Sequence, residues 1–421
     1  MPGSPKRSTT TFLAIVVIFL TLSLVFYPRE GFEAGITGLN LFWEVVFPSL
    51  LPFFILSELM LGVGVVHALG VLLEPLMRPL FSVPGVGAFA MSMGLAAGYP
   101  MDAVITAKFR KSKLCSRVEG ERLLAFTNTA DPLFMFSAVA VGMFRNAGIG
   151  MLLAIAHYIG AFLVGILFKL YGRGQDIEET TRQSVRGNLF RRAYQEMLRA
   201  REEDGRSFGK LLGDAVNDSI KTLLMICGFI IFFAVVIKVL TLSGIIPLLS
   251  LPIIGLFKLI GLDLSLVTPF MSGIFEIDIG SAQAAATKAP LVEQLAIVSF
   301  IIAWSGLSVH AQIASVLTGT DIRFAPYIIA RIIHGVLAAV FTVILFNWGV
   351  GQTETSVFAP FTPSTVAVAT AEPSASARWF ASLGALKNWV LVTGGLTLFS
   401  ISLYLARRMR IVFFRARVSD K

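Results

Sequence analysis

The sequence has little charge and almost no cysteine. Charged residues make up 14% of its 421 residues and apolar residues 55%, and the two cysteines are Cys115 and Cys227. So little charge excludes an ordinary soluble domain, and a mean hydropathy of +0.78 is typical of an integral membrane protein with many spans. Two isolated cysteines give neither a disulfide framework nor the spacing of a metal site. We therefore predict an all-α polytopic membrane protein without a metal site.

Catalytic signatures are also missing. The chain has no HExxH, GxSxG or P-loop motif. Ser305, Ser308 and His310 follow each other on one apolar segment, but no acid is placed near them, so an intramembrane hydrolase is the weaker alternative. The net charge of +9 lies in short loops beside apolar segments, where it orients a membrane protein and does not indicate nucleic-acid binding. We predict that the chain is not an enzyme.

Two apolar segments in succession are broken by polar and helix-breaking residues. The first, at 82–109, breaks at Gly98-Tyr99-Pro100, and Asp102 follows directly. The second, at 121–143, breaks at Asn128, Thr129 and Asp131. In hydrocarbon every backbone amide and carbonyl needs a partner, so broken helices persist only where they are buried in protein or line a wet cavity. The pair is therefore typical of a transport site.

The second half of the chain contains a corresponding pair. The segment at 263–289 breaks around Ser272-Gly273, before Glu276 and Asp278, and the segment at 291–317 breaks at Ser305-Gly306. Such pairs in two halves are the best sequence pointer to a transporter's binding site. At one constant offset Asp102 corresponds to Glu276, and Glu119 to Glu293. We expect two repeats, each with a re-entrant helical hairpin and a broken transmembrane helix.

Composition divides the chain into six parts. Unbroken spans are expected at 11–27, 41–66, 149–170, 220–242, 325–348 and 386–405, which with the broken spans make about eight in total. Segments 67–80 and 243–259 are interrupted by prolines and are predicted to be interfacial helices. The six parts are an N-terminal transmembrane helix and loop (1–40), a first repeat (41–172), a charged cytoplasmic connector (173–213), a second repeat (214–349), a Pro/Ser/Thr-rich extracytoplasmic linker (350–385) and a C-terminal transmembrane helix with a basic tail (386–421).

Basic residues predict the orientation. Lys6 and Arg7, the cluster from Lys108 to Arg117, the connector and the C-terminal arginines all belong on the cytoplasmic side. The spans connect these positions only if each hairpin enters and leaves on one face, the first from the cytoplasm and the second from outside. We therefore expect inverted repeats, the architecture of alternating-access transporters, with both termini cytoplasmic.

The expected chemistry is anion binding. N-termini of half-helices offer unpaired amides and a partial positive charge, which suit a carboxylate. Ionisable residues inside a membrane are functional by default, or else pair with each other, as Asp131 or Glu276 would with Arg331. His157, His334 and Glu58 fit a structural role better. The candidate substrate-binding residues are Gly98, Tyr99, Pro100, Asn128, Thr129, Asp131, Ser272, Gly273, Ser305, Gly306 and Ser308, and the candidate coupling or gating residues are Asp102, Glu276, Asp278, His310 and Arg331.

Three runs of sequence resemble a known family. They read AAGYPMDAVITAKFRK, EGERLLAFTNTADPLFMFSAVAVGMF and LLAIAHYIGAFLVGILFKL. They are similar to the sporulation integral membrane proteins of the YlbJ (SpoVV) family, which carry two gate, or nucleoside-recognition, domains related to the transport core of concentrative nucleoside transporters. The resemblance extends from about Leu41 to Trp348. At one position the chain departs from it: Asp102 stands where the family pattern has a small residue.

The resemblance implies transport of dipicolinate (pyridine-2,6-dicarboxylate) across the outer forespore membrane of a sporulating bacterium. A nucleoside or other small solute is the alternative substrate, and a membrane assembly factor for the spore envelope is the alternative of another class. No cofactor is expected, and Na+ or H+ is the expected coupling ion. The expected partners are the anionic solute and the lipid bilayer, with homo-oligomerisation left open and no nucleic acid.

Overall fold

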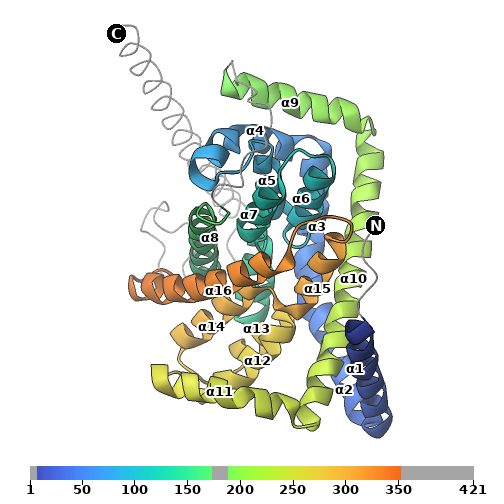
Figure 1. Cartoon of the computed structure of the whole chain (residues 1–421), viewed down its shortest axis with the longest axis vertical. Helices are drawn as coiled ribbons and strands as arrows, with labels where there is room; N and C mark the ends of the chain where they lie inside the picture. The colour runs from blue at the N-terminus through green and yellow to red at the C-terminus, as the bar shows by residue number, and fades with distance from the viewer. Residues whose placement is uncertain (1–6, 173–187, 352–421) are drawn as a thin grey trace, which may run out of the picture.

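The computed structural model describes residues 7–172 and 188–351, and every regular element in these two ranges is a helix (Figure 1). Most of the predicted linker at 350–385 and the whole predicted C-terminal span and tail lie outside the described residues. The same holds for the first part of the predicted connector. These predictions therefore stay predictions.

The N-terminal region contains one more helix than predicted. Its elements are α1 (Arg7–Phe26), α2 (Pro28–Leu41), the π-helix η1 (Phe42–Val46) and α3 (Phe47–Gly62). The loop predicted between the first two spans is wrong, because residues 28–41 form α2, which is bent by 103° from α1. Gly38 lets α2 approach the long helix α10 (Phe208–Leu242) closely: a Cβ at Gly38 would lie 3.1 Å from the Cβ of Ala234.

The first repeat continues from α3 in the predicted order. Its elements are α4 (Val65–Leu76) with the π-helix η2 (Met77–Phe81), the hairpin α5 (Gly87–Ala97) and α6 (Met101–Lys111), the broken span α7 (Arg117–Thr127) and η3 (Phe134–Met143), and α8 (Gly148–Phe168). The predicted breaks at Gly98–Pro100 and at Asn128–Asp131 are confirmed. α9 (Leu189–Asp204) then packs on α4, where Arg192 forms an ion pair with Glu74 at 3.0 Å, before α10 leads into the second repeat.

The second repeat repeats this order. Its elements are α11 (Ile245–Ile260), η4 (Leu264–Leu266), the hairpin α12 (Val267–Phe275) and α13 (Ile277–Ala285), the broken span α14 (Leu291–Trp304) and α15 (Gly306–Val316), and α16 (Phe324–Asn347). The break at Ser305 is confirmed, but the predicted break at Ser272-Gly273 is wrong, because both residues lie inside α12. The hairpin turns at Glu276 instead. Its two helices pack so closely that a Cβ on Gly280 would lie 2.3 Å from the Cα of Gly273.

In each hairpin the first and last residues lie close together, and a glutamate in each repeat holds these two ends together. Glu119, at the start of α7, accepts a hydrogen bond of 2.6 Å from Arg78, which precedes the first hairpin. Glu293, at the start of α14, accepts one of 2.7 Å from the backbone N–H of Asp263, which precedes the second. These are the glutamates that the constant offset pairs. The hairpins are therefore re-entrant, as predicted.

The two repeats are inverted. Figure 1 shows α4, α5 and α6 toward one end of α10, and α11 and α12 toward its other end. The contacts agree with this view. Arg110, at the end of the first hairpin, pairs with Asp321, so the first hairpin ends near the C-terminal end of the α14–α15 span. The second hairpin ends directly before α14, at the N-terminal end of the same span. Because α14 and α15 together are long and apolar enough to cross a membrane, the two hairpins open at opposite ends of this span.

The described residues contain four to six candidate membrane spans. Among the described residues four helices or collinear pairs are long and apolar enough to cross a membrane, namely α8, α10, α14–α15 and α16. Two bent pairs, α1–α2 and α3–α4, raise the number to six if each is one span. The protein is therefore polytopic, and the total of about eight stays a prediction.

Single-cysteine labelling tests the inversion. We expect Lys113→Cys, at the exit of the first hairpin, and Lys288→Cys, at the exit of the second, to react with a membrane-impermeant maleimide from opposite sides. Both lysines are exposed, whereas the native cysteines are buried, so the parent protein is the background control. Labelling of both positions in intact cells, or of both only after lysis, would contradict inverted repeats.

Candidate functional site

Each hairpin tip lies directly against the break of a span in its own repeat. A Cβ at Gly98, in the first tip, would lie 2.8 Å from Oδ2 of Asp131 in the first broken span. A Cβ at Gly306, in the second broken span, would lie 3.1 Å from the carbonyl oxygen of Phe275 in the second tip. Both glycines have positive φ, +63° and +71°. The two hairpin turns, at Gly98–Pro100 and at Glu276, thus each form a close contact with the break of a span.

Two of the half-helices that start at these breaks are capped by buried carboxylates. Oδ1 of Asp131 accepts a hydrogen bond of 2.8 Å from the N–H of Phe134, and Oε2 of Glu276 accepts one of 2.9 Å from the N–H of Ile279. Such caps satisfy amides that a helix start otherwise leaves unpaired. The N-termini of η3 and α13 therefore have fewer amides to offer an anion than we predicted.

The other two half-helices, α6 and α15, have no side-chain cap at the residue that precedes them, although Asp102 places a carboxylate in the first turn of α6. They pack side by side through Ala103 and Ala107 of α6 and Val309 and Ile313 of α15. The Arg110–Asp321 pair joins the end of α6 to the loop that follows α15, so the two helices run in the same direction and start at the two breaks. The partial positive charges of two helix N-termini, one from each repeat, are thereby brought to the same region.

A chain of buried polar side chains connects the repeats. Asn128 donates to Oδ1 of Asp102 at 2.9 Å and accepts from the hydroxyl of Tyr327 at 3.1 Å. Thr127 also donates to Asp102, at 3.2 Å, and the hydroxyls of Tyr327 and Ser305 lie 3.3 Å apart. Both oxygens of Asp102 are therefore engaged. This is how the fold accommodates a carboxylate at the position where the family resemblance implies a small residue.

Arg331 joins the two broken spans. It is fully buried on α16 and donates to the backbone carbonyls of Ala125 and Asn128 in the first span, and to that of Ala303 in the second at 3.4 Å. A cation is favoured at such helix C-termini. The alternative that Arg331 pairs with Asp131 or Glu276 is wrong, since Arg331 forms no ion pair within the described residues.

Two buried histidines add hydrogen bonds to this connection between the broken spans. Nε2 of His157 accepts from the backbone N–H of Ala130 at 3.1 Å, next to the first break. His334 contacts Arg331 through Nδ1 at 3.1 Å and the carbonyl oxygen of His157 through Nε2 at 2.8 Å. Three of the four ring nitrogens therefore have partners inside the protein. These contacts agree with the structural role that the sequence favoured for His157 and His334.

The remaining candidates lie around the second break. Asp278 is buried beside Glu276, and its Oδ1 has no hydrogen-bond partner within residues 7–172 and 188–351. His310 bonds the carbonyl oxygen of Gly306 through Nδ1 at 2.7 Å, and its ring lies against Trp304 and Tyr327. Ser308 is buried on the same helix. These side chains are close enough to the break to respond to a change there.

Two other candidates contribute differently from what the sequence indicated. The hydroxyl of Tyr99 donates to the carbonyl oxygen of Ile302 at 2.9 Å, so it fastens the first tip to the second repeat. Thr129 is buried, and its hydroxyl lies 3.4 Å from the carbonyl oxygen of Thr127. Tyr99 therefore holds the first tip in place, whereas the contact of Thr129 stays within its own break.

Tyr327 is not among the site residues predicted from the sequence, although its spacing from Arg331 and His334 indicates it. Tyr327, Arg331 and His334 are spaced i, i+4 and i+7 along an otherwise apolar span, so they share one helix face. A polar stripe on a membrane helix points to the protein interior. Of the three, only Arg331 was among the site candidates, yet Tyr327 bonds to both repeats.

Comparisons with known proteins found a relative, a domain family and a solved structure that are similar to this chain. The chain is 48% identical over 342 residues to the sporulation integral membrane protein YlbJ of Bacillus subtilis, a match that covers 81% of this chain and 84% of YlbJ. The Gate family, described as nucleoside recognition, matches residues 43–172. A solved structure of CNTnw, in a state described as intermediate 3, has a TM-score of 0.45 and 13% sequence identity, and the match covers 83% of this chain and 87% of that chain.

Proposed function

Because the chain belongs to the family of sporulation integral membrane proteins that includes YlbJ, we propose that it moves a small anionic solute across a bacterial membrane by alternating access. The observation that carries this proposal is the meeting of two hairpin tips, from inverted repeats, with the breaks of two spans. In transporters built from inverted repeats, the substrate binds near the midplane at discontinuous helices, and one repeat rocks against the other.

The uncapped starts of α6 and α15 support an anionic substrate. They belong to different repeats and lie in one region, so a molecule with two carboxylates is suited to bridge them. Dipicolinate has two carboxylates on one planar ring, and we propose it as the substrate. The outer forespore membrane is then the proposed site of action, with both termini in the cytoplasm.

Other residues receive supporting roles in this proposal. Ser305 and Ser308, at the second break, are polar side chains that could add hydrogen bonds to the solute. Asn128, at the first break, could do so by exchanging its bond with Asp102 or Tyr327. Asp278, with its partnerless oxygen, is the carboxyl group that we assign to the coupling ion, Na+ or H+. Arg331 and Asp102 would position the breaks and would not contact the solute, because their polar atoms are largely engaged within the protein.

Binding to the purified protein tests the proposal. Ligands that bind only the native state raise the midpoint of thermal unfolding as their concentration increases. We expect dipicolinate to raise it, and picolinate, which has a single carboxylate on the same ring, to raise it far less. Equal shifts with the two compounds would contradict bridging by two carboxylates.

A nucleoside is the second candidate, because the family that matches residues 43–172 is described as nucleoside recognition. Uridine therefore belongs in the same experiment. If uridine raises the unfolding midpoint and dipicolinate does not, a nucleoside replaces dipicolinate as the proposed substrate, and the proposed transport mechanism is unchanged.

A further inference from the structure

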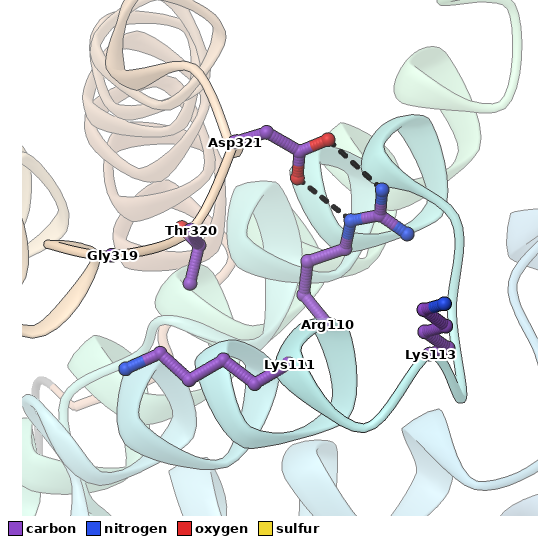
Figure 2. Close-up of a pocket in the computed structure, with 6 residues that line it drawn as sticks. All are labelled: Arg110, Lys111, Lys113, Gly319, Thr320 and Asp321. Carbon is purple, nitrogen blue, oxygen red and sulfur yellow. Dashed lines mark hydrogen bonds and ion pairs between the residues drawn. The ribbon is translucent and has the colours of Figure 1, made fainter. Parts of the chain in front are cut away.

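A basic pocket lies outside the site described above, where the end of α6 meets the loop between α15 and α16. It has a volume of about 240 Å³ and is lined by Arg110, Lys111, Lys113, Gly319, Thr320 and Asp321 (Figure 2). The lining holds three cations and one carboxylate, which gives a formal charge of +2. Because these residues come from both repeats, a ligand in the pocket would touch both.

Arg110 and Asp321 form the wall of this pocket. Nε and one terminal nitrogen of Arg110 donate to the two oxygens of Asp321 at 2.7 and 2.9 Å, and the other terminal nitrogen donates to the carbonyl oxygen of Cys115 at 3.0 Å. The hydrogen bonds from Arg110 hold the pKa of Asp321 below its ordinary value. The carboxylate is thus neutralised by its partner, and it opposes a bound anion little.

Lys111 and Lys113 supply charge that nothing in the described chain neutralises. The side-chain ammonium of neither lysine has a hydrogen-bond or ion-pair partner within the residues that the structure describes, although both lysines line the pocket. The ammonium of Lys111 lies beside Gly319, where an added Cβ would be 3.8 Å from Nζ. Figure 2 shows the stem of Arg110 between the two lysines. A water molecule occupies roughly 30 Å³ of liquid, so the cavity has room for a phosphate group.

The backbone of Lys113 shows that this lysine is not an ordinary helix-end cation. Lys113 has φ +56° and closes α6 in a Schellman motif, with its own N–H bonded to the carbonyl of Arg110 and that of Leu114 to the carbonyl of Phe109. Glycine is the usual residue at this position, and the chain uses Gly205 and Gly261 in this way after α9 and α11. A lysine one turn earlier in the helix would interact with the helix dipole and would orient the protein in the membrane equally well, without positive φ.

We propose that this pocket binds the phosphate group of an anionic ligand, with the side chains of Lys111 and Lys113 turning toward the group from the two sides of Arg110, which forms the wall. Basic pockets between membrane helices bind phosphate-bearing lipid headgroups at the membrane surface, and a free phosphate presents the same chemistry. The bound group would fasten the exit of the first hairpin to the second repeat. The inference does not depend on the identity of the transported solute.

Thermal unfolding of the purified full-length protein tests the pocket directly. The probes are inorganic phosphate, dioctanoyl phosphatidylglycerol and dioctanoyl phosphatidylcholine. Lys113→Gly keeps the backbone conformation and removes the charge, so its midpoint without probe should equal or exceed that of the parent, while its apparent affinity should fall about tenfold. Lys111→Gln should weaken binding similarly. Lys108→Gln, which removes an exposed charge in the same helical turn but outside the lining, should bind like the parent.

The three probes separate the sources of the phosphate. A shift with both inorganic phosphate and phosphatidylglycerol supports a site that needs only the phosphate group, and a shift with one of them identifies that source. No shift with either would overturn the proposal. So would equal losses in Lys108→Gln and Lys113→Gly, which indicate diffuse surface charge. An equal shift with phosphatidylcholine, whose choline neutralises its phosphate, would also overturn the proposal, because the site would then not select an anionic ligand.

Discussion

Arg331→Ala is expected to lower the unfolding midpoint sharply and to abolish transport with it. Arg331 donates hydrogen bonds to the carbonyls of Ala125, Asn128 and Ala303, which belong to broken spans of both repeats. Alanine would leave these buried acceptors unpaired, at a cost of about 1–3 kcal/mol for each group that finds no other donor. Thermal unfolding of the detergent-purified variant measures the loss, and a transport assay in vesicles measures the consequence.

Two variants make the result specific. Ile332→Ala changes the next residue of α16, whose side chain is 47% exposed, and should move the midpoint little. Arg331→Lys keeps the charge but offers one nitrogen where the guanidinium reaches three carbonyls, so we expect an intermediate midpoint. If Arg331→Ala unfolds like the parent protein and only transport is lost, Arg331 acts on the solute or the coupling ion and is not the joint between the spans.

The sequence predicts correctly those elements in which the membrane restricts the residue types that can occur. A break in an apolar helix exposes backbone groups, so polar or small residues such as those at 128–131 and at 305–306 reveal it. Glu119 and Glu293 were matched by spacing alone, and each holds the ends of its hairpin together. Inversion followed from the charge pattern because basic residues stay on one side.

The errors come from residues whose effect depends on a distant partner. Small residues mark either a break or a close helix contact, and only the tertiary structure decides between them. Ser272-Gly273 was interpreted as a break, but Gly273 packs against Gly280 of the next helix. Residues 28–40 have the glycine content of a loop, yet they form a helix whose Gly38 faces α10. Neither partner is visible in the local pattern.

The candidate site was predicted in part for the same reason. The positions of Asp102, Asn128 and Ser305 follow from the breaks, whereas their hydrogen-bond partners lie on other helices. Tyr327 is 199 residues from Asn128 along the chain, and Arg331 is 203 residues from it. One sequence offers no means of pairing residues at such separations. It therefore could not show that Arg331 binds carbonyls and not a carboxylate.

Gly98→Ala and Gly306→Ala are expected to abolish transport, because each glycine is the point where a hairpin tip meets a broken span. Both positions have positive φ, where a side chain costs about 1–3 kcal/mol in strain, and Gly98 also has ψ −156°, a region that essentially only glycine adopts. The new methyl at Gly98 would also lie 2.8 Å from Oδ2 of Asp131, and that at Gly306 3.1 Å from the carbonyl oxygen of Phe275. The tip or the groups that it contacts must then shift, which disturbs the arrangement of the half-helix N-termini that would hold an anion. Uptake of labelled dipicolinate into vesicles measures the effect.

Matched glycines separate this contact from a general intolerance of alanine. Gly228 in α10 and Gly255 in α11 have no neighbour within 4 Å of an added Cβ and no positive φ, so alanine there should preserve transport and stabilise the helix by roughly 0.5–1 kcal/mol. A second test uses Asp131, whose side chain contacts Gly98 but not Gly306. Asp131→Ala should recover part of the stability lost in Gly98→Ala and none of that lost in Gly306→Ala, since only contacting residues couple. Equal recovery in both, or normal transport by Gly98→Ala, would mean that the tips are not docked on the breaks during the transport cycle.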